Sequence, residues 1–103
     1  MINFKPIKIS NPARNDFKNI AQYTLKEWGK LQKKTYLNYF KQSFITLSQN
    51  NKNLMPLGKP RQDIGEGLLS YRIKEHVVYF RETKQEFVIV RILHSRMDPE
   101  KHL

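Results

Sequence analysis

The chain of 103 residues contains no cysteine. A disulfide framework, a thiol nucleophile and a thiolate metal site are therefore excluded. No stretch approaches the roughly 20 apolar residues that a membrane-spanning helix needs, and the opening residues MINFKPIKISNP lack the apolar segment of a signal peptide. We therefore expect a cytoplasmic protein that makes no membrane contact.

Acidic residues are scarce: nine Asp and Glu stand against nineteen Lys and Arg, which gives a formal net charge of +10. Because the carboxylates are few and scattered, a hydrolase that uses two of them is not favoured. His76, His94 and His102 do not have the spacing of metal ligands, so we expect no metal and no cofactor. The positive charge predicts an acidic partner, such as nucleic acid or an anionic protein surface.

Two helices joined by a glycine are the first predicted feature. Ser10 or Asn11 can cap the first helix, and Pro12 suits its first position. Gly29 should end this helix as a left-handed cap, and a second helix should cover 30–49. Two helices separated by one residue predict an antiparallel hairpin.

Each predicted helix carries one apolar stripe at helical spacing. In the first helix the stripe consists of Ala13, Phe17, Ile20, Ala21, Thr24 and Trp28. In the second it consists of Leu37, Phe40, Phe44 and Leu47, with Tyr36 beside them and Lys33 at the rim. We expect both stripes to pack into one core.

Strands dominate the second half of the chain, after a long Asn-, Gly- and Pro-rich connection over 50–67. Strands are predicted over 68–74, 77–83 and 86–94, and the short turns between them predict an antiparallel meander. The last is apolar at nearly every position, which favours a central strand covered on both faces. With a short edge strand over 4–9, the order is β-α-α-β-β-β. We predict one α+β domain over 1–103, with the helical hairpin packed on a small antiparallel sheet.

Basic residues on the predicted strands have no evident role in packing. Arg72 and Lys74 alternate, so they should share one face of their strand, either as a solvated surface or as a site. Arg81 lies near the end of the next strand. Arg91 interrupts an apolar strand, and there it needs an ion-pair partner or a target contact. The candidate partners of Arg91 are Asp98, Asp63 and Glu82.

The two histidines of the sheet are expected to have structural roles. His94 ends the last strand, where a hydrogen-bonded side chain is favoured over a general acid or base. His76 falls at a turn and should be exposed.

Four segments occur in the order and spacing of a known family. They are ARNDFKNIAQYTLKEWG, PLGKPRQDI, GLLSYRIKEHVVYFR and VRILHSRMDPEKHL. Together they cover about residues 9–103 and resemble the ParE family of bacterial toxins, within the ParE/RelE superfamily. The resemblance implies a type II toxin with a helical hairpin on an antiparallel sheet. It also implies a ParD-like antitoxin as partner and DNA gyrase as target.

RelE-like relatives instead cut messenger RNA on the ribosome, with basic sheet residues that stabilise the phosphorane and a C-terminal group that moves protons. In that alternative Arg72 and Lys74 match the basic positions, and His94 would carry the proton. The tail HSRMDPEKHL departs from the ribonuclease branch, because it has no Tyr and no paired His. The resemblance therefore favours a gyrase inhibitor that is not an enzyme; an inert relative that only binds antitoxin is a third possibility.

The residues expected to meet the target are then the basic and histidine side chains of the strands and tail. They are Arg72, Lys74, Arg81, Arg91, His94 and Arg96. Arg96 and Asp98 flank the end of the last strand, before a proline, and we expect them to lock the tail against the sheet.

Overall fold

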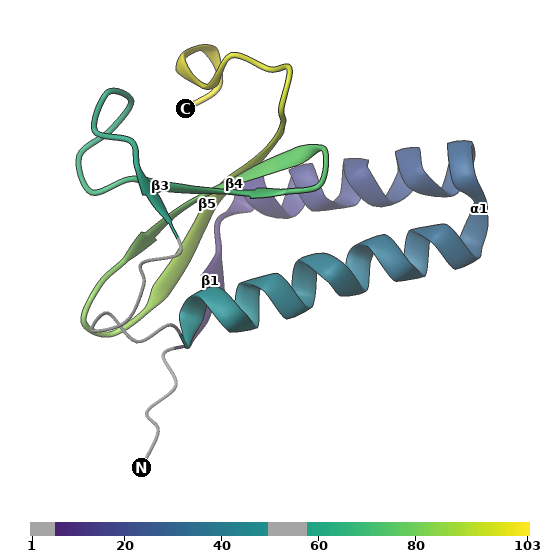
Figure 1. Ribbon diagram of the computed structural model, residues 1–103, viewed down its shortest axis with the longest axis horizontal. Helices are drawn as coiled ribbons and strands as arrows, with labels where there is room; N and C mark the ends of the chain where they lie inside the picture. Colours follow the sequence, from purple (N-terminus) through teal and green to yellow (C-terminus); the bar gives the residue numbers. More distant parts are fainter. Residues whose placement is uncertain (1–5, 50–57) are drawn as a thin grey trace.

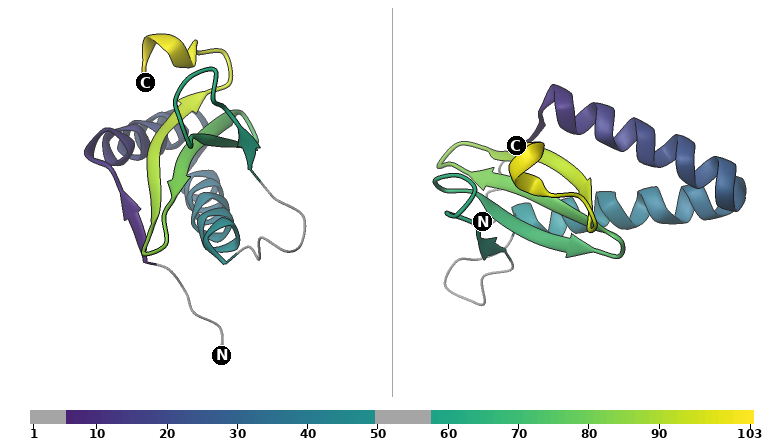
Figure 2. Two further views of the ribbon diagram at one scale, coloured as in Figure 1. Left: turned by 90° about the vertical axis from the view of Figure 1, so that its left-hand side faces the viewer. Right: turned by 90° about the horizontal axis from the view of Figure 1, so that it is seen from above.

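In the computed structural model, which describes residues 6–49 and 58–103, a helical hairpin packs on one face of a five-stranded sheet (Figures 1 and 2). Strand β1 covers Ile7–Ile9 and leads directly into helix α1, Asn11–Ser48. The start of the strand predicted over 4–9 lies outside the described residues, as does 50–57 of the long connection. The predicted α+β class is confirmed.

The sequence signals at both ends of the first helical arm have clear physical roles. Ser10 is the N-cap, and its Oγ accepts a hydrogen bond from the Ala13 N–H at 3.1 Å. Gly29 has φ 90° and ψ 176°, a conformation that is almost confined to glycine. The chain reverses there, so α1 consists of two antiparallel arms, 11–28 and 30–48 (Figure 1). The hairpin is confirmed, but Gly29 is not the left-handed helical cap that we predicted.

The strands of the sheet have the order β1-β5-β4-β3-β2. Strands β3 (Leu69–Ile73), β4 (His76–Glu82) and β5 (Phe87–His94) form the predicted antiparallel meander. The sheet differs from the prediction at both edges. β1 pairs with β5 in parallel, and a two-residue strand β2, Lys59–Pro60, pairs with β3. A hydrophobic pattern identifies a strand but specifies neither its partner nor its direction.

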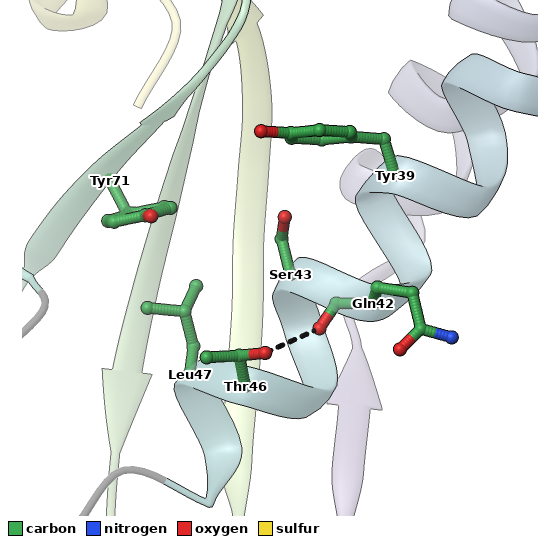
Figure 3. Close-up of a pocket in the computed structure, with 6 residues that line it drawn as sticks. All are labelled: Tyr39, Gln42, Ser43, Thr46, Leu47 and Tyr71. Carbon is green, nitrogen blue, oxygen red and sulfur yellow. Dashed lines mark hydrogen bonds between the residues drawn. The ribbon is translucent and has the colours of Figure 1, made fainter.

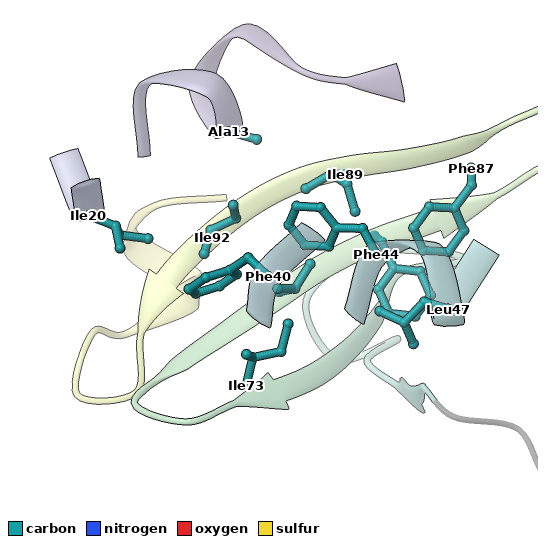
Figure 4. Close-up of a cluster of buried hydrophobic side chains, with 11 residues drawn as sticks. Ala13, Ile20, Phe40, Phe44, Leu47, Ile73, Phe87, Ile89 and Ile92 are labelled. Atoms are coloured by element: carbon teal, nitrogen blue, oxygen red, sulfur yellow. The ribbon is translucent and has the colours of Figure 1, made fainter. Parts of the chain in front are cut away.

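The main core lies between the hairpin and the sheet (Figure 4). Its buried residues are Ala13, Ile20, Phe40, Phe44, Leu47, Ile73, Val78, Phe80, Phe87, Ile89 and Ile92. The two predicted helical stripes therefore do form one core. Trp28 and Leu37 are exceptions, because Trp28 is 69 % exposed and the half-buried Leu37 lines a depression on the hairpin surface. The hairpin extends past the sheet (Figure 1), so the end of the first stripe has no strand to pack against.

A smaller cluster covers the opposite face of the sheet. Leu68, Tyr79 and Leu93 are buried there, and Ile64, Val77 and Val90 pack against them. Segment 61–67 lies over this face beside the C-terminal tail (Figure 2). The prediction that β5 is covered on both faces is therefore confirmed. We call this face, which α1 does not cover, the outer face.

Candidate functional site

A groove of about 460 Å³ opens on the outer face of the sheet. It is lined by Lys59, Arg61, Ser70, Tyr71, Arg72, Val77, Tyr79, Ser95, Met97 and Pro99. These residues come from β2 and the residue after it, from β3 and β4, and from the tail. Three of the lining side chains are cationic and none is acidic, so the groove attracts anionic groups.

Arg61 is held in place within this groove. Its Nε and Nη2 donate to the two carboxylate oxygens of Asp63 at 3.1 and 3.0 Å. Its backbone N–H donates to the Leu68 carbonyl at 2.8 Å, and its own carbonyl accepts from the Ile64 N–H at 3.0 Å. The hydrogen bond from Arg61 lowers the pKa of the Asp63 carboxyl, and the same contact raises the pKa of Arg61. The guanidinium is thus oriented before any ligand arrives.

Arg72 and Lys74 do not share a face, contrary to the prediction. Arg72 lines the groove, and its Nε donates to the Lys74 carbonyl at 2.9 Å. Lys74 follows the end of β3 and has φ 56°, which breaks the strand alternation. Its Nζ lies 4.9 Å from the ring centroid of Tyr39, on the side of the sheet that faces α1. The sheet therefore separates the two cations.

His94 also lies on the helix-facing side, away from the groove. It pairs in register with His76, and the two rings lie 5.4 Å apart. Its Nδ1 accepts a hydrogen bond from the Arg96 N–H at 3.1 Å. The prediction of a hydrogen-bonded histidine at the end of the strand is therefore confirmed.

His76 was predicted to be exposed, which is wrong. It is the first residue of β4, and its ring packs against Phe40 while Nδ1 lies 2.7 Å from the Tyr36 hydroxyl. Burial, together with the nearby His94, lowers the pKa of His76 to about 4. Burial also raises the pKa of Tyr36. The imidazole is therefore neutral at physiological pH, and its role is to pack the hairpin onto the sheet.

Arg91 forms a structural ion pair, as one of its two interpretations predicted, but the partner is not among the three candidates. Its Nε and Nη2 donate to the Asp16 carboxylate at 2.7 and 2.9 Å, and that carboxylate also accepts from the Ile92 N–H at 3.0 Å. Nη1 donates to the carbonyl of His102 at 2.7 Å. Arg91 therefore ties the first arm of α1, strand β5 and the tail together.

Arg91 and Asp98 organise the C-terminal tail differently from the expected Arg96–Asp98 lock. The Asp98 carboxylate caps the short 3-10 helix Pro99–Lys101 by accepting from the Glu100 N–H at 3.0 Å. Within the described residues no ion pair joins it to Arg96, whose side chain is exposed. The tail is held to the rest of the molecule by Arg91 and by the Ser95 N–H, which donates to the Glu75 carbonyl at 2.8 Å. A role for Arg96 in fixing the tail stays a prediction.

Arg81 lies outside the lining of the groove. It is exposed on β4, and its Nε donates to the Glu66 carbonyl at 3.2 Å. This hydrogen bond links β4 to segment 61–67 near the end of that segment. Of the six expected target residues, the structure therefore brings only Arg72 into the groove.

The hairpin carries two further depressions. One, of about 330 Å³, has Phe17, Phe44 and Ile92 in its lining, with Arg14 and Lys41 beside them. The other, of about 480 Å³, lies nearer the tip of the hairpin and also includes Lys41. Its lining residues are Leu25, Lys30, Lys33, Lys34, Leu37, Asn38 and Lys41. Both combine apolar side chains with cationic ones.

A small pocket of about 150 Å³ lies between the second arm of α1 and β3 (Figure 3). It is lined by Tyr39, Gln42, Ser43, Thr46, Leu47 and Tyr71. The Thr46 hydroxyl is already engaged, because it donates to the Gln42 carbonyl at 3.0 Å. The polar groups left for a ligand are those of the two tyrosines, Gln42 and Ser43, in a pocket too small for most ligands.

In residues 6–49 and 58–103 no group of three or more His, Asp or Glu is placed to bind a metal ion. The helices in this part of the chain are too short or too polar to cross a bilayer.

Reasoning from the sequence missed three residues that define this region. Lys59 and Arg61 belong to the motif PLGKPRQDI, whose spacing of Arg and Asp two residues apart allows the pairing seen at Arg61. The third is Asp16, the partner of Arg91. It lies 75 residues from Arg91 in the sequence, and no local pattern indicates the contact.

Comparison with known proteins agrees with this architecture. Residues 7–99 match the family of the ParE toxin of the type II toxin-antitoxin system parDE. Toxin ParE1 of Caulobacter vibrioides is 25 % identical over 99 residues, which cover 96 % of this chain and 98 % of that protein.

Solved structures show the same fold. The chromosomal ParDE system of P. aeruginosa contains a chain with a TM-score of 0.74 at 17 % identity, covering 88 % of this chain and 96 % of that one. The E. coli DinJ-YafQ toxin-antitoxin complex contains a second, with a TM-score of 0.60 at 16 % identity over 89 % and 93 %. Since the family match spans nearly all of the sequence, this chain belongs to the ParE family of toxins of type II toxin-antitoxin systems.

Proposed function

We propose that this ParE-family toxin inhibits DNA gyrase without cleaving nucleic acid, that a ParD-like antitoxin neutralises it, and that it acts in the cytoplasm. The observation that carries the proposal is the separation of Arg72 from Lys74 and His94. Arg72 lies in the groove of the outer face, whereas the other two side chains lie on the helix-facing side. These are the three residues that a ribonuclease would have to bring together.

The groove has neither a histidine nor a carboxylate for proton transfer. A general base must come within about 3 Å of the proton that it removes, directly or through one water. The two buried residues of the lining that carry a hydroxyl, Tyr79 and Ser70, are only 4 % and 7 % exposed. The cations Lys59, Arg61 and Arg72 are suited to holding an anionic group. This combination favours binding over cleavage.

The alternative is a RelE-like, ribosome-dependent endoribonuclease that acts on messenger RNA. One observation favours it: Arg61 and Arg72 present two guanidinium groups in one groove, which would stabilise the charge of a phosphorane. In that case the proton carrier would have to come from the ribosome or from Tyr79.

Two assays on the purified toxin separate these functions. We expect inhibition of gyrase supercoiling together with accumulation of cleaved DNA, and no cleavage of messenger RNA in a reconstituted translation reaction. An Arg72→Gln variant tests the groove, and Arg14→Gln is its control, because Arg14 is an exposed arginine of α1. Messenger RNA cleavage that disappears in Arg72→Gln but persists in Arg14→Gln would contradict the gyrase proposal and support the alternative.

The hairpin depressions support an acidic antitoxin segment as partner. Both have an apolar lining with basic residues beside it, and they share Lys41, so one extended segment can occupy them in succession. A partly disordered acidic segment that folds on binding suits such a surface. Its association rate should fall as salt is added, because steering between opposite charges is screened. Equal association rates at low and high ionic strength would contradict this mode of binding.

A further inference from the structure

The tip of the helical hairpin exposes large apolar side chains. Trp28 is 69 % exposed and Leu31 is 79 % exposed, on either side of Gly29. Leu25, one helical turn before Trp28, is 39 % exposed. The tip projects away from the sheet (Figures 1 and 2), so no other described segment covers it. We call Leu25, Trp28 and Leu31 the tip cluster.

Lysines surround the tip cluster. Over 17–49 the sequence has the single acidic residue Glu27, against Lys18, Lys26, Lys30, Lys33, Lys34 and Lys41. Lys30, Lys33 and Lys34 line the same depression as Leu25. The apolar side chains of the tip are therefore flanked by Lys26, Lys30, Lys33 and Lys34, which we call the lysine ring.

The exposure of Trp28 conflicts with its sequence pattern. Trp28 continues the stripe of Phe17 and Thr24, yet it lies beyond the end of the sheet. An apolar side chain left in water contributes nothing to folding but can contribute to binding. Positions where a regular pattern and the fold disagree are often functional.

We propose that the tip cluster docks into an apolar pocket on an acidic protein surface of the toxin's target. This inference rests on the proposed function, which makes that surface part of gyrase. Tryptophan is one of the residues that contribute most of the binding energy at protein interfaces, and the exposed Leu31 adds apolar surface on the other side of Gly29. The lysine ring should pair with acidic residues around the partner's pocket. Such pairs would attract the partner to the tip and would also discriminate against surfaces that lack acidic residues.

Other occupants fit the tip less well. A second copy of the chain would bring one lysine ring against another, which is repulsive. A bilayer would receive only the end of a hairpin, whereas surface-bound helices lay a whole apolar face on the membrane. Nucleic acid would pair with the lysines through its phosphates but would offer no apolar pocket for Leu31.

The test compares the double substitution Trp28→Ala/Leu31→Ala with the control Ile45→Ala, which removes a 40 % exposed apolar side chain at the far end of the same helix. Each full-length protein is assayed for gyrase inhibition, growth arrest in cells, antitoxin binding and thermal unfolding.

We expect the double substitution to weaken gyrase inhibition and growth arrest at least about tenfold. Antitoxin binding should change less than about threefold, and the unfolding temperature should match that of the wild type. Ile45→Ala should behave as the wild type. A charge reversal, Lys30→Glu, should weaken inhibition more at low salt than at high salt. Because Lys30 also lines the depression that we assign to the antitoxin, this variant should weaken antitoxin binding as well.

The outcomes distinguish the inference from the function on which it rests. If the wild type arrests growth without inhibiting gyrase, the proposal that gyrase is the target is wrong. The effect of the double substitution on growth arrest then tests the tip proposal by itself. Full potency of the double variant in growth arrest overturns the tip proposal. Binding of the wild type, but not of the double variant, to anionic vesicles or to duplex DNA also overturns it. So does a dimer of the wild type that the double substitution dissociates.

Discussion

Replacing Asp16 by alanine should destabilise the fold markedly. Asp16 accepts two hydrogen bonds from Arg91 and one from the Ile92 N–H, and its side chain is only 11 % exposed. The substitution leaves Arg91, 21 % exposed, without its counter-charge, and a backbone donor without an acceptor. Removing one partner of a fully buried pair costs about 3–5 kcal/mol. Since both groups keep some contact with water, we expect about 2–4 kcal/mol.

Urea unfolding followed by circular dichroism measures this change, with an unchanged slope as evidence that only stability moved. Asp16→Asn should cost less, because its amide oxygen can still accept from the Ile92 N–H. The matched control is Asp63→Ala. This substitution also removes the carboxylate partner of an arginine, Arg61, but the Asp63 side chain is 59 % exposed, so stability should stay unchanged within error. A loss below about 0.5 kcal/mol for Asp16→Ala would refute the reasoning, since exposed ion pairs contribute that little.

Two further substitutions and one truncation test other parts of the structure. The pKa of His76 falls from an ordinary 6.5 to about 4 on folding, so the unfolded chain binds its proton more readily. The stability that this supplies is complete above pH 6.5 and is lost towards pH 4. Because the ring is only half-buried, His76→Gln should reduce this dependence by about 1–2 kcal/mol. Gly29→Ala should cost about 1–3 kcal/mol, because φ 90° strains any side chain although no atom lies in its way. Truncation after Leu93 should abolish toxicity while antitoxin binding largely survives, because residues 94–103 form one wall of the groove and do not touch the hairpin depressions.

Each of these three predictions has an outcome that would contradict it. His102→Gln removes an exposed histidine, and an equal change in pH dependence in both variants would mean that burial is not the cause. For Gly29, thermal unfolding of the alanine variant at the wild-type temperature would show that the reversal does not require glycine. Growth arrest and antitoxin pull-down are compared for the truncated and full chains. Full toxicity without residues 94–103 would show that the target surface does not depend on the tail.

The fold was predictable from the sequence wherever its signals are local. Ser10 and Gly29 bound the first arm of the hairpin because a cap and a positive φ depend on neighbouring residues alone. The meander followed from short turns between apolar runs. The pairing of β1 with β5, by contrast, joins Ile7 to Phe87, and alternation within a strand says nothing about such a distant partner.

The candidate site was harder to predict for two physical reasons. A residue with positive φ turns a side chain to the other face, so Lys74 parted from Arg72 although their spacing suggested one surface. The partner of Arg91 depends on where α1 crosses the edge of β5, which no nearby residue encodes. Among the expected target residues, Arg72 does line the groove. The positions of Lys59 and Arg61 in the same groove became evident only from the three-dimensional structure.

The parallel contact between β1 and β5 has a consequence for the order of events during synthesis. Hairpin α1 consists of local contacts and can form as soon as it is made, since helices and their hairpins are fast to fold. Strand β1 must wait, because its partner residues Phe87–Ile89 are translated 80 positions later, counting from Ile7 to Phe87. Arg91, which links the tail to α1, is made later still. A nascent toxin therefore presents its hairpin, including the depression near the tip that we assign to the antitoxin and that only hairpin residues line, well before the outer-face groove exists. An antitoxin already in the cell can thus capture the chain before it becomes toxic.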